Sequence, residues 1–436
     1  WRNEICTAFS HRFSQLWMKL QPLYKSKVGI VLLPVLFMAI VINDIVKLVS
    51  AYLVRIDLVK RLLSEVLRKR LERAEKESVT YGPPPADYLS SFDYYLSASD
   101  EIYIERDGSV SQNATISIED WVNAKSSDDL MLIVGNRGMG KTTTLNRICK
   151  NISKLSDTKS KRVHAKVANS EDFYSWLSDL LGTPVSSVND FKNFDKSLNK
   201  KLVCFVDDIQ NLFLSIVGGF EAYKLFLEIV SLKTKNIYWC LAVNSRSWSY
   251  LKGVLGEEHF YGKVLHLQQW KDYEIQKLIL VRHEQTKFKR TFDESIKAYG
   301  AGERIGQQAE GQFFRLLWGQ SRGNPRSALM YWISAISSPQ EKQIHVGIPL
   351  FIGSGLVATM SDDALFLLAA IARHDSLTKD ELKKITDIND IVIRKCLKEA
   401  EDKNLIWSDA EERVRISSRA QYVIDYFLIG KNFLYE

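Results

Sequence analysis

The feature that most constrains this chain is an apolar segment that runs directly into a glycine-rich loop. Residues 130–134 (Leu-Met-Leu-Ile-Val) have the composition of a buried strand. The loop that follows reads Gly-Asn-Arg-Gly-Met-Gly-Lys-Thr from Gly135 to Thr142, and a helix is expected to begin near Thr142. This order matches the pattern G-x-x-x-x-G-K-[ST] of a phosphate-binding loop, or P-loop, at every fixed position.

Each fixed residue of this loop has a physical task. Glycines let backbone N–H groups curve around phosphate oxygens, and the N-terminus of the next helix adds a favourable dipole. Lys141 is expected to reach the β- and γ-phosphates, and the Thr142 hydroxyl to bind Mg²⁺. The sequence therefore predicts ATP and Mg²⁺ as cofactors, with a nucleotide site formed by Gly135, Asn136, Arg137, Gly138, Met139, Gly140, Lys141, Thr142 and Thr143.

Two later apolar segments end in polar residues suited to the same site. Residues 202–206 precede Asp207 and Asp208. We expect Asp207 to hold Mg²⁺ through water and Asp208 to polarise the attacking water. Residues 237–243 precede Asn244 and Arg246, either of which is placed to sense the γ-phosphate.

Strand-like and helix-like segments alternate through this part of the chain. Strands are expected at 163–168, 202–206, 237–243 and 264–268, and helices at 171–181 and 220–233. Such alternation predicts an α/β fold with a parallel sheet that binds its ligand at the carboxyl ends of the strands.

Residues 129–350 resemble the AAA+ and STAND branch of P-loop ATPases, including its origin-recognition-like members. Besides the P-loop and Asp207, the resemblance is carried by residues 264–267 with 271–279 and by Gly323-Asn324-Pro325-Arg326, which looks like the family's lid motif. The resemblance implies that Arg326 is a second sensor that reaches the nucleotide from a helical lid.

The chain departs from that family in two places. The acidic pair is Asp207-Asp208, as in STAND switches, rather than Asp-Glu, and the shorter side chain predicts slow hydrolysis. Residues 257–263 lack the arginine that reaches a neighbouring subunit's nucleotide in ring-forming relatives, which leaves Arg246 as a substitute. The resemblance therefore gives no support for activation between subunits.

Charge and hydropathy set the N-terminal region apart. Residues 1–80 hold 14 Lys/Arg and 7 Asp/Glu, so they carry the whole net charge of +7. Residues 28–42 contain no charged residue, and a helix over 28–48 would be long enough to cross a bilayer. The denser basic residues after it would place the ATPase on the cytoplasmic side. The alternative is a buried helix of a soluble protein, because Asn43 and Asp44 interrupt the apolar run.

The composition is otherwise that of a folded chain. At 46% hydrophobic and 25% charged residues, it excludes disorder and collagen-like repeats. Five scattered cysteines fit reduced thiols better than disulfides or a zinc site. A length of 436 residues indicates more than one domain.

The C-terminal residues have the order of a winged helix-turn-helix. Helices are expected at 362–373, 378–386 and 389–404, followed by short strands around 405–407 and 414–416. Residues 361–436 hold 12 basic and 15 acidic residues, a net charge of −3, which disfavours duplex binding. A protein-contact or autoinhibitory role is favoured.

We thus predict five regions and one function. The regions are 1–82 (amphipathic segment, transmembrane helix and basic stalk), 83–128 (linker and a β-hairpin over 101–118 that turns at 106–109), 129–268 (P-loop core), 269–350 (helical lid) and 355–436 (winged helix). The predicted function is a membrane-anchored ATPase switch with a single span. It would pass a conformational change to a membrane partner, such as a channel, or to a homo-oligomer. The alternative is a DNA-binding ATPase of the initiator or transposition-regulator type.

Overall fold

A computed structural model describes residues 57–74, 81–94, 102–106, 109–256, 261–293, 296 and 305–435. The chain divides into two units, Trp1–Val66 and Leu67–Glu436. Helix α3 (Asp57–Ala74) begins in the first unit and ends in the second. No helix within the described ranges is both long enough and apolar enough to span a bilayer. The predicted transmembrane helix at 28–48 lies outside these ranges and stays a prediction.

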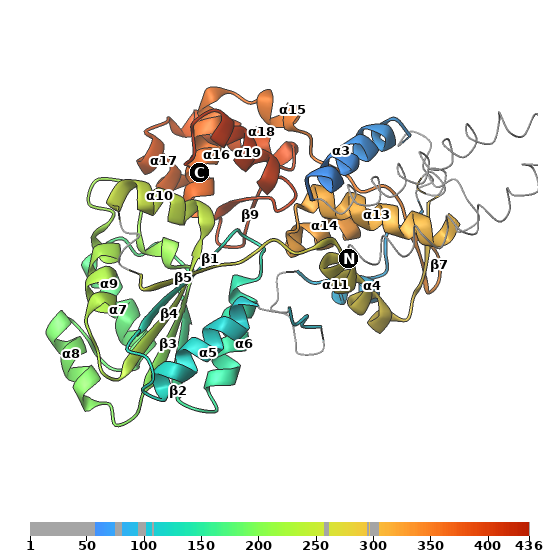
Figure 1. The fold of residues 1–436 in the computed structure, drawn as a ribbon. Helices are drawn as coiled ribbons and strands as arrows, with labels where there is room; N and C mark the ends of the chain where they lie inside the picture. The colour runs from blue at the N-terminus through green and yellow to red at the C-terminus, as the bar shows by residue number, and fades with distance from the viewer. Residues whose placement is uncertain are drawn as a thin grey trace, which may run out of the picture. The chain divides into compact units, whose positions relative to one another are not determined.

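The second unit is built around a five-stranded parallel sheet (Figure 1). Its strands lie in the order β2-β3-β4-β1-β5. Every residue of β1, β3 and β4 is buried, as expected of apolar strands covered on both faces. The predicted α/β fold with a parallel sheet is confirmed. The bounds are β1 Leu130–Gly135, β2 Asp157–Arg162, β3 Leu202–Asp207, β4 Ile237–Asn244 and β5 Lys263–His266.

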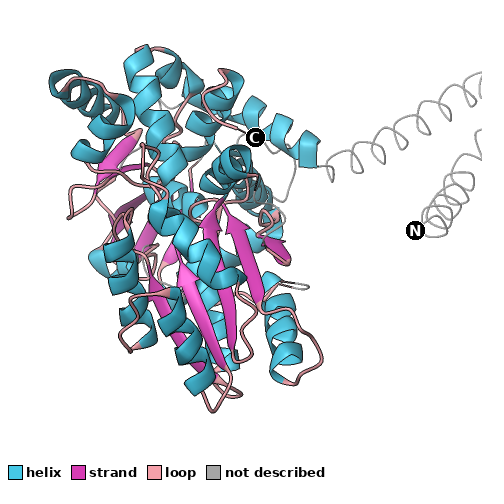
Figure 2. Cartoon of the chain, turned by 90° about the vertical axis from the view of Figure 1, so that its left-hand side faces the viewer, coloured by secondary structure: helices cyan, strands magenta, loops and turns pink. Residues whose placement is uncertain are grey.

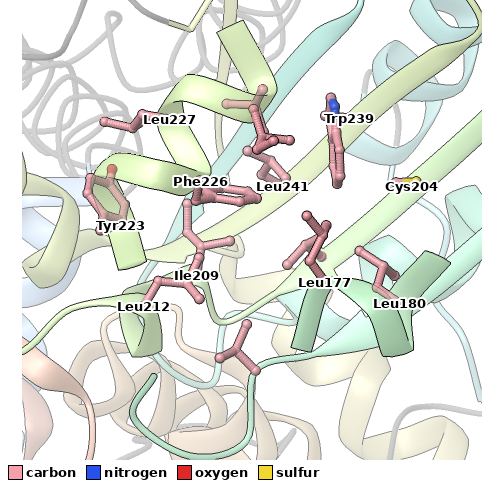
Figure 3. Packing of buried hydrophobic residues seen from close by; sticks show 14 of the residues in the cluster. Leu177, Leu180, Cys204, Ile209, Leu212, Tyr223, Phe226, Leu227, Trp239 and Leu241 are labelled. Atoms are coloured by element: carbon pink, nitrogen blue, oxygen red, sulfur yellow. The ribbon is translucent and has the colours of Figure 1, made fainter. Parts of the chain in front are cut away.

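Two hydrophobic layers cover the two faces of the sheet. Leu130, Leu132 and Val134 of β1 share one layer with buried residues of α7, α8, α9 and α10, part of which Figure 3 shows around Trp239 and Phe226. Met131 and Ile133, which alternate with them, share the other layer with α5 and α6. The helix bounds are α5 Val110–Val122, α6 Lys141–Ile152, α7 Ser170–Leu181, α8 Val188–Ser197, α9 Glu221–Ser231 and α10 Ser245–Leu255.

Two sequence predictions in this region are wrong. The hairpin expected around residues 106–109 is replaced by helix α5, whose first turn is capped by the Ser109 hydroxyl. The buried residues Ala114, Ile118 and Trp121 recur every three to four positions, which is a helical period. The strand expected at 163–168 lies earlier, as β2, because this edge strand is polar and mostly exposed and so carries no apolar signal.

Residues 272–346, called the lid below, combine helices with a small sheet. Helices α11 (Asp272–Thr286), α13 (Ile305–Ser321) and α14 (Pro325–Ser334) pack with α4 (Ala86–Ser90) around the buried Trp332. Strands β6 (Lys289–Phe292), β8 (Gln343–Val346) and β7 (Ile336–Gln340) form a sheet that the sequence did not predict.

Residues 354–435, called the C-terminal domain below, have the predicted winged-helix order. Helices α15 (Ser354–Ala358), α16 (Asp362–His374), α17 (Lys379–Thr386) and α18 (Asp390–Asp402) precede an antiparallel pair, β9 (Ile406–Ser408) and β10 (Val414–Ile416). A further helix, α19 (Gln421–Gly430), follows. Figure 1 shows this domain, in orange and red, above the five-stranded sheet, and Figure 2 shows the same chain turned by 90° with its strands in magenta.

Candidate nucleotide-binding site

The P-loop has the backbone shape that its glycines predict. Gly138 and Gly140 adopt φ values of +81° and +93°, in the left-handed region that favours glycine. A Cβ on Gly138 would lie only 2.7 Å from Asn324 Oδ1, so a larger residue would collide with the lid. Helix α6 begins at Lys141, directly after the loop, and its N-terminus therefore faces the predicted phosphate site.

Lys141 and Thr142 lie where the motif places them. The buried Lys141 ammonium donates to the carbonyl oxygens of Gly135 at 3.0 Å and Asn136 at 3.4 Å, so it lies over the loop. The Thr142 hydroxyl donates to Asp207 Oδ2 at 2.5 Å. A hydroxyl and a carboxylate from two different elements thus meet at one point, and both are oxygen ligands that Mg²⁺ prefers.

The electrostatics of Asp207 fit a cation. Burial, reinforced by the neighbouring Asp208 carboxylate, raises the pKa of Asp207 to about 6. The Thr142 hydrogen bond and the Lys141 charge oppose this rise only in part. A buried carboxylate with a raised pKa favours a positive ion beside it. The residues present therefore fit the predicted magnesium.

Asp208 is engaged by its neighbours. Its carboxylate accepts from Arg162 Nε at 2.6 Å and from Gln210 Nε2 at 2.9 Å. Its backbone is in the left-handed region, with φ at +59°. Arg162 was missed by the sequence analysis, although it ends β2 directly beside Asp207 of β3. Knowing the position of β2 would have revealed it.

The remaining P-loop residues hold the loop shape. The backbone N–H of the buried Met139 donates to the Asn136 carbonyl oxygen, and Thr144 N donates to the Gly140 carbonyl oxygen. Thr143, in the first turn of α6, is half-buried.

Asn244 meets a residue that the sequence did not single out. Its side-chain N–H donates to Asp375 Oδ1 at 2.9 Å, from the turn between α16 and α17. Arg137 Nε of the P-loop lies 4.0 Å from the same oxygen, and Arg415 Nη1 of β10 lies 3.5 Å from the other. Burial alone would raise the pKa of Asp375, but Arg137 and Arg415 hold it well below its usual range. No local sequence signal marks Asp375 or Arg415.

The two predicted arginine sensors have different surroundings. Arg246 contacts the C-terminal domain, where its Nε donates to Asp425 Oδ2 of α19 at 3.1 Å. Arg326 lies against the P-loop, where its backbone N–H donates to the Gly138 carbonyl oxygen at 3.4 Å. Its Nε donates to the Tyr94 carbonyl oxygen at 3.1 Å. The structure thus brings Arg326 to the loop and Arg246 to the C-terminal domain.

No protein-family model matches this chain, and neither does any curated protein. Solved structures that align with it include Aeropyrum pernix ORC2 (16% identity, TM-score 0.37), Cdc6p from Pyrobaculum aerophilum (13%, 0.40) and the Thermotoga maritima RuvB Holliday junction branch migration motor (13%, 0.33). The alignments cover 78%, 78% and 76% of this chain and 98% of each of the others.

The strand order and the loop define the class of protein. A parallel sheet in the order β2-β3-β4-β1-β5, with a P-loop after β1, is typical of AAA+ ATPases. The acidic pair ends β3, next to β4, and the lid contacts the loop through Asn324, whose Nδ2 donates to the Arg137 carbonyl oxygen at 2.7 Å. The chain therefore has a parallel α/β fold with a P-loop, in a strand order typical of AAA+ ATPases.

Proposed function

We propose that this protein is an ATP-dependent switch whose nucleotide state sets the position of its C-terminal domain. The observation that carries the proposal is the hydrogen bond from Asn244, at the end of β4, to Asp375 of the C-terminal domain. A residue suited to sensing a γ-phosphate is thereby joined directly to the domain that would move.

Further contacts bind the same domain to the ATPase and to the lid. The Ser247 hydroxyl donates to the Arg373 carbonyl oxygen at 2.6 Å, and the Ser327 hydroxyl of the lid donates to the Ser418 carbonyl oxygen at 2.7 Å. The Lys166 ammonium donates to the carbonyl oxygens of Gln210 at 2.9 Å and His374 at 3.1 Å. A structural change caused by binding or hydrolysis of the nucleotide can therefore be transmitted to the C-terminal domain through these contacts.

We expect hydrolysis to be slow. Asp208, the residue placed to polarise the attacking water, is held in an ion pair by Arg162. Its carboxylate must leave that pair, or share it, before it can orient a water molecule. Slow turnover fits a switch, which needs to hold a nucleotide state, better than it fits a motor.

Nucleotide binding by the full chain tests this proposal. Lys141→Ala removes the ammonium expected at the β- and γ-phosphates, and Lys154→Ala removes an exposed lysine just beyond α6 as a matched control. We expect Lys141→Ala to weaken Mg²⁺–ATP binding roughly 10- to 100-fold, because a charged hydrogen bond contributes about 1.5–3 kcal/mol. Equal affinity of the two variants would refute a nucleotide site at this loop.

Duplex DNA binding is the second candidate function. Helix α18 exposes Arg394, Lys395 and Lys398, and α17 exposes Lys383 and Lys384. These cations lie on the helix pair that a winged helix presents to DNA. Charge reversal of Arg394, Lys395 and Lys398 together should abolish salt-dependent duplex binding by the full chain. Retention of that binding, or its absence from the unaltered chain, would remove this candidate.

We also propose that residues 28–48 attach the protein to a membrane. The support is the uncharged run at 28–42 with basic residues on both sides. Lys or Arg in place of Ile30, Leu33 and Leu36 should release the full chain from lipid vesicles. Equal vesicle binding by the substituted chain would contradict the proposal.

A further inference from the structure

Asp375 lies among hydrogen-bond donors and positive charges of the kind that bind the terminal phosphate of a nucleotide. Its carboxylate accepts the Asn244 side-chain hydrogen bond at 2.9 Å, with Arg137 of the P-loop close by. Lys141 and Arg162 are also close enough to stabilise its negative charge. These four side chains come from the P-loop, its helix and the ends of β4 and β2, the elements expected to surround the γ-phosphate of a bound ATP.

We infer that Asp375 occupies the γ-phosphate position and makes the protein discriminate between ADP and ATP. This inference rests on the proposed function. A carboxylate and a terminal phosphate are both anionic oxygen acceptors, so the same donors suit either one. They cannot share one position, because two anions at close range repel each other. ADP lacks the γ-phosphate and leaves Asp375 in place.

Arg137 shows that this cluster has unused donor capacity. Its Nη1 atom is buried and has no hydrogen-bond partner among the residues that the structure describes. A buried guanidinium donor without a partner is costly unless some state of the protein satisfies it. A phosphate has three terminal oxygens where the carboxylate has two, and it could accept this further bond. Arg137 is therefore the residue that we expect to gain most when ATP displaces Asp375.

The exchange links nucleotide choice to the C-terminal domain. Asp375 lies in the turn between α16 and α17, so its departure from Asn244 breaks a contact between the C-terminal domain and the ATPase. The contact between Asp375 and Asn244 therefore lowers the affinity for ATP. By thermodynamic linkage, bound ATP lowers the stability of this contact by the same factor. ADP binding is not part of this exchange.

The alternative is that Asp375 only neutralises Arg137 and Arg415. The full chain with Asp375→Asn distinguishes the two roles, because it keeps a hydrogen-bond acceptor for Asn244 and removes the charge. Asp409→Asn is the matched control, since Asp409 pairs with Arg415 at 2.9 Å but is not bonded to Asn244. The readouts are the Kd of Mg²⁺–ADP and the Kd of a Mg²⁺-bound non-hydrolysable ATP analogue.

We expect Asp375→Asn to tighten the binding of the ATP analogue roughly tenfold relative to ADP, within the usual range of coupling between two ligands. Asp409→Asn should leave the ratio unchanged. If the ratio of the two Kd values is unchanged in Asp375→Asn, even though both affinities change, the inference is overturned. If Asp375→Asn does not fold, the double variant Asp375→Asn with Arg415→Gln also removes the positive charge that would be left without this partner. The same change in the ratio of the two Kd values is expected of it. Failure of the unaltered chain to bind either nucleotide would instead overturn the proposed function.

Discussion

The lid and the C-terminal domain both contact the P-loop, but they do so with different chemistry. The lid uses neutral groups, since Asn324 Nδ2 and the Arg326 backbone N–H donate to the loop carbonyls of Arg137 and Gly138. The C-terminal domain uses charge, through Asp375 beside Arg137. A contact to backbone carbonyls is indifferent to an arriving anion, whereas a carboxylate contact competes with it.

This difference assigns the two regions different tasks. The two hydrogen bonds from the lid to the loop carbonyls do not depend on how many phosphates the nucleotide has. The C-terminal domain is suited to responding to the number of phosphates, because two of its contacts with the ATPase are ion pairs, Arg137 with Asp375 and Arg246 with Asp425. The predictions below test whether the charged contact and the neutral contact differ as this account requires.

The largest effect on stability is expected at the ion pair between Arg246 and Asp425, the second charged contact of the C-terminal domain. Arg246→Ala leaves the buried Asp425 carboxylate without its ion partner, and burial already raises the pKa of Asp425. We expect a loss of about 3 kcal/mol in the free energy of unfolding, because an uncompensated buried charge is strongly destabilising. Urea unfolding measures the loss. The double variant Arg246→Ala with Asp425→Asn should recover part of it, and no recovery would show that Arg246 acts elsewhere.

The next effect is the pH dependence of magnesium binding. The pKa of Asp207 is raised to about 6, so protons compete with Mg²⁺ below that pH. Calorimetric titration of the full chain should show Mg²⁺ affinity falling by up to about tenfold per pH unit below pH 6, and staying level above it. In the metal-free chain, stability falls as pH rises from about 4 to 6, since the folded state holds this proton more tightly than the unfolded state does. An affinity that is flat between pH 5 and 7 contradicts the assignment.

A smaller effect is expected at the neutral contact. Asn324→Ala removes the bond to the Arg137 carbonyl oxygen and the cap that Asn324 Oδ1 gives to α14 through Ser327 N. The free energy of unfolding should fall by about 1 kcal/mol, which is typical of a lost N-cap. Asn324→Ala should weaken ADP and ATP binding equally. Selective loss of one nucleotide would show that the lid, too, responds to the γ-phosphate.

The smallest effect is that of salt. Raising ionic strength from about 0.1 to 1 M shortens the Debye length from about 10 to 3 Å, although buried pairs are screened less than exposed ones. We expect a modest rise in backbone amide exchange at residues 373–376 and none at 326–328. Equal rises at both contacts would remove the distinction between them.

The parts of the site that lie close together in sequence could be predicted from it. The loop from Gly135 to Thr142 and the acidic pair at Asp207 carry their signals locally, in residue type and spacing, and the structure joins them through Thr142. The buried strands β1, β3 and β4 were equally visible, because apolar runs of this length have few alternatives.

The residues that join one domain to another could not be predicted in this way. Asp375 and Arg415 are separated from Asn244 by more than 130 positions, and each looks like ordinary surface charge in its own segment. Arg162 was hidden because the polar edge strand β2 gives no apolar pattern. The hairpin was wrongly predicted because the charged and glycine residues at 106–108 resemble a turn, whereas Ser109 in fact begins a helix.

The most direct test of the account compares backbone amide hydrogen exchange at residues 373–376 in two nucleotide states of the full chain. We predict faster exchange with a Mg²⁺-bound non-hydrolysable ATP analogue than with Mg²⁺–ADP, because the γ-phosphate displaces Asp375 from Asn244. Exchange at residues 326–328 of the lid should be the same in both states. Identical exchange at 373–376 with the two nucleotides, or slower exchange with the ATP analogue, would contradict the account.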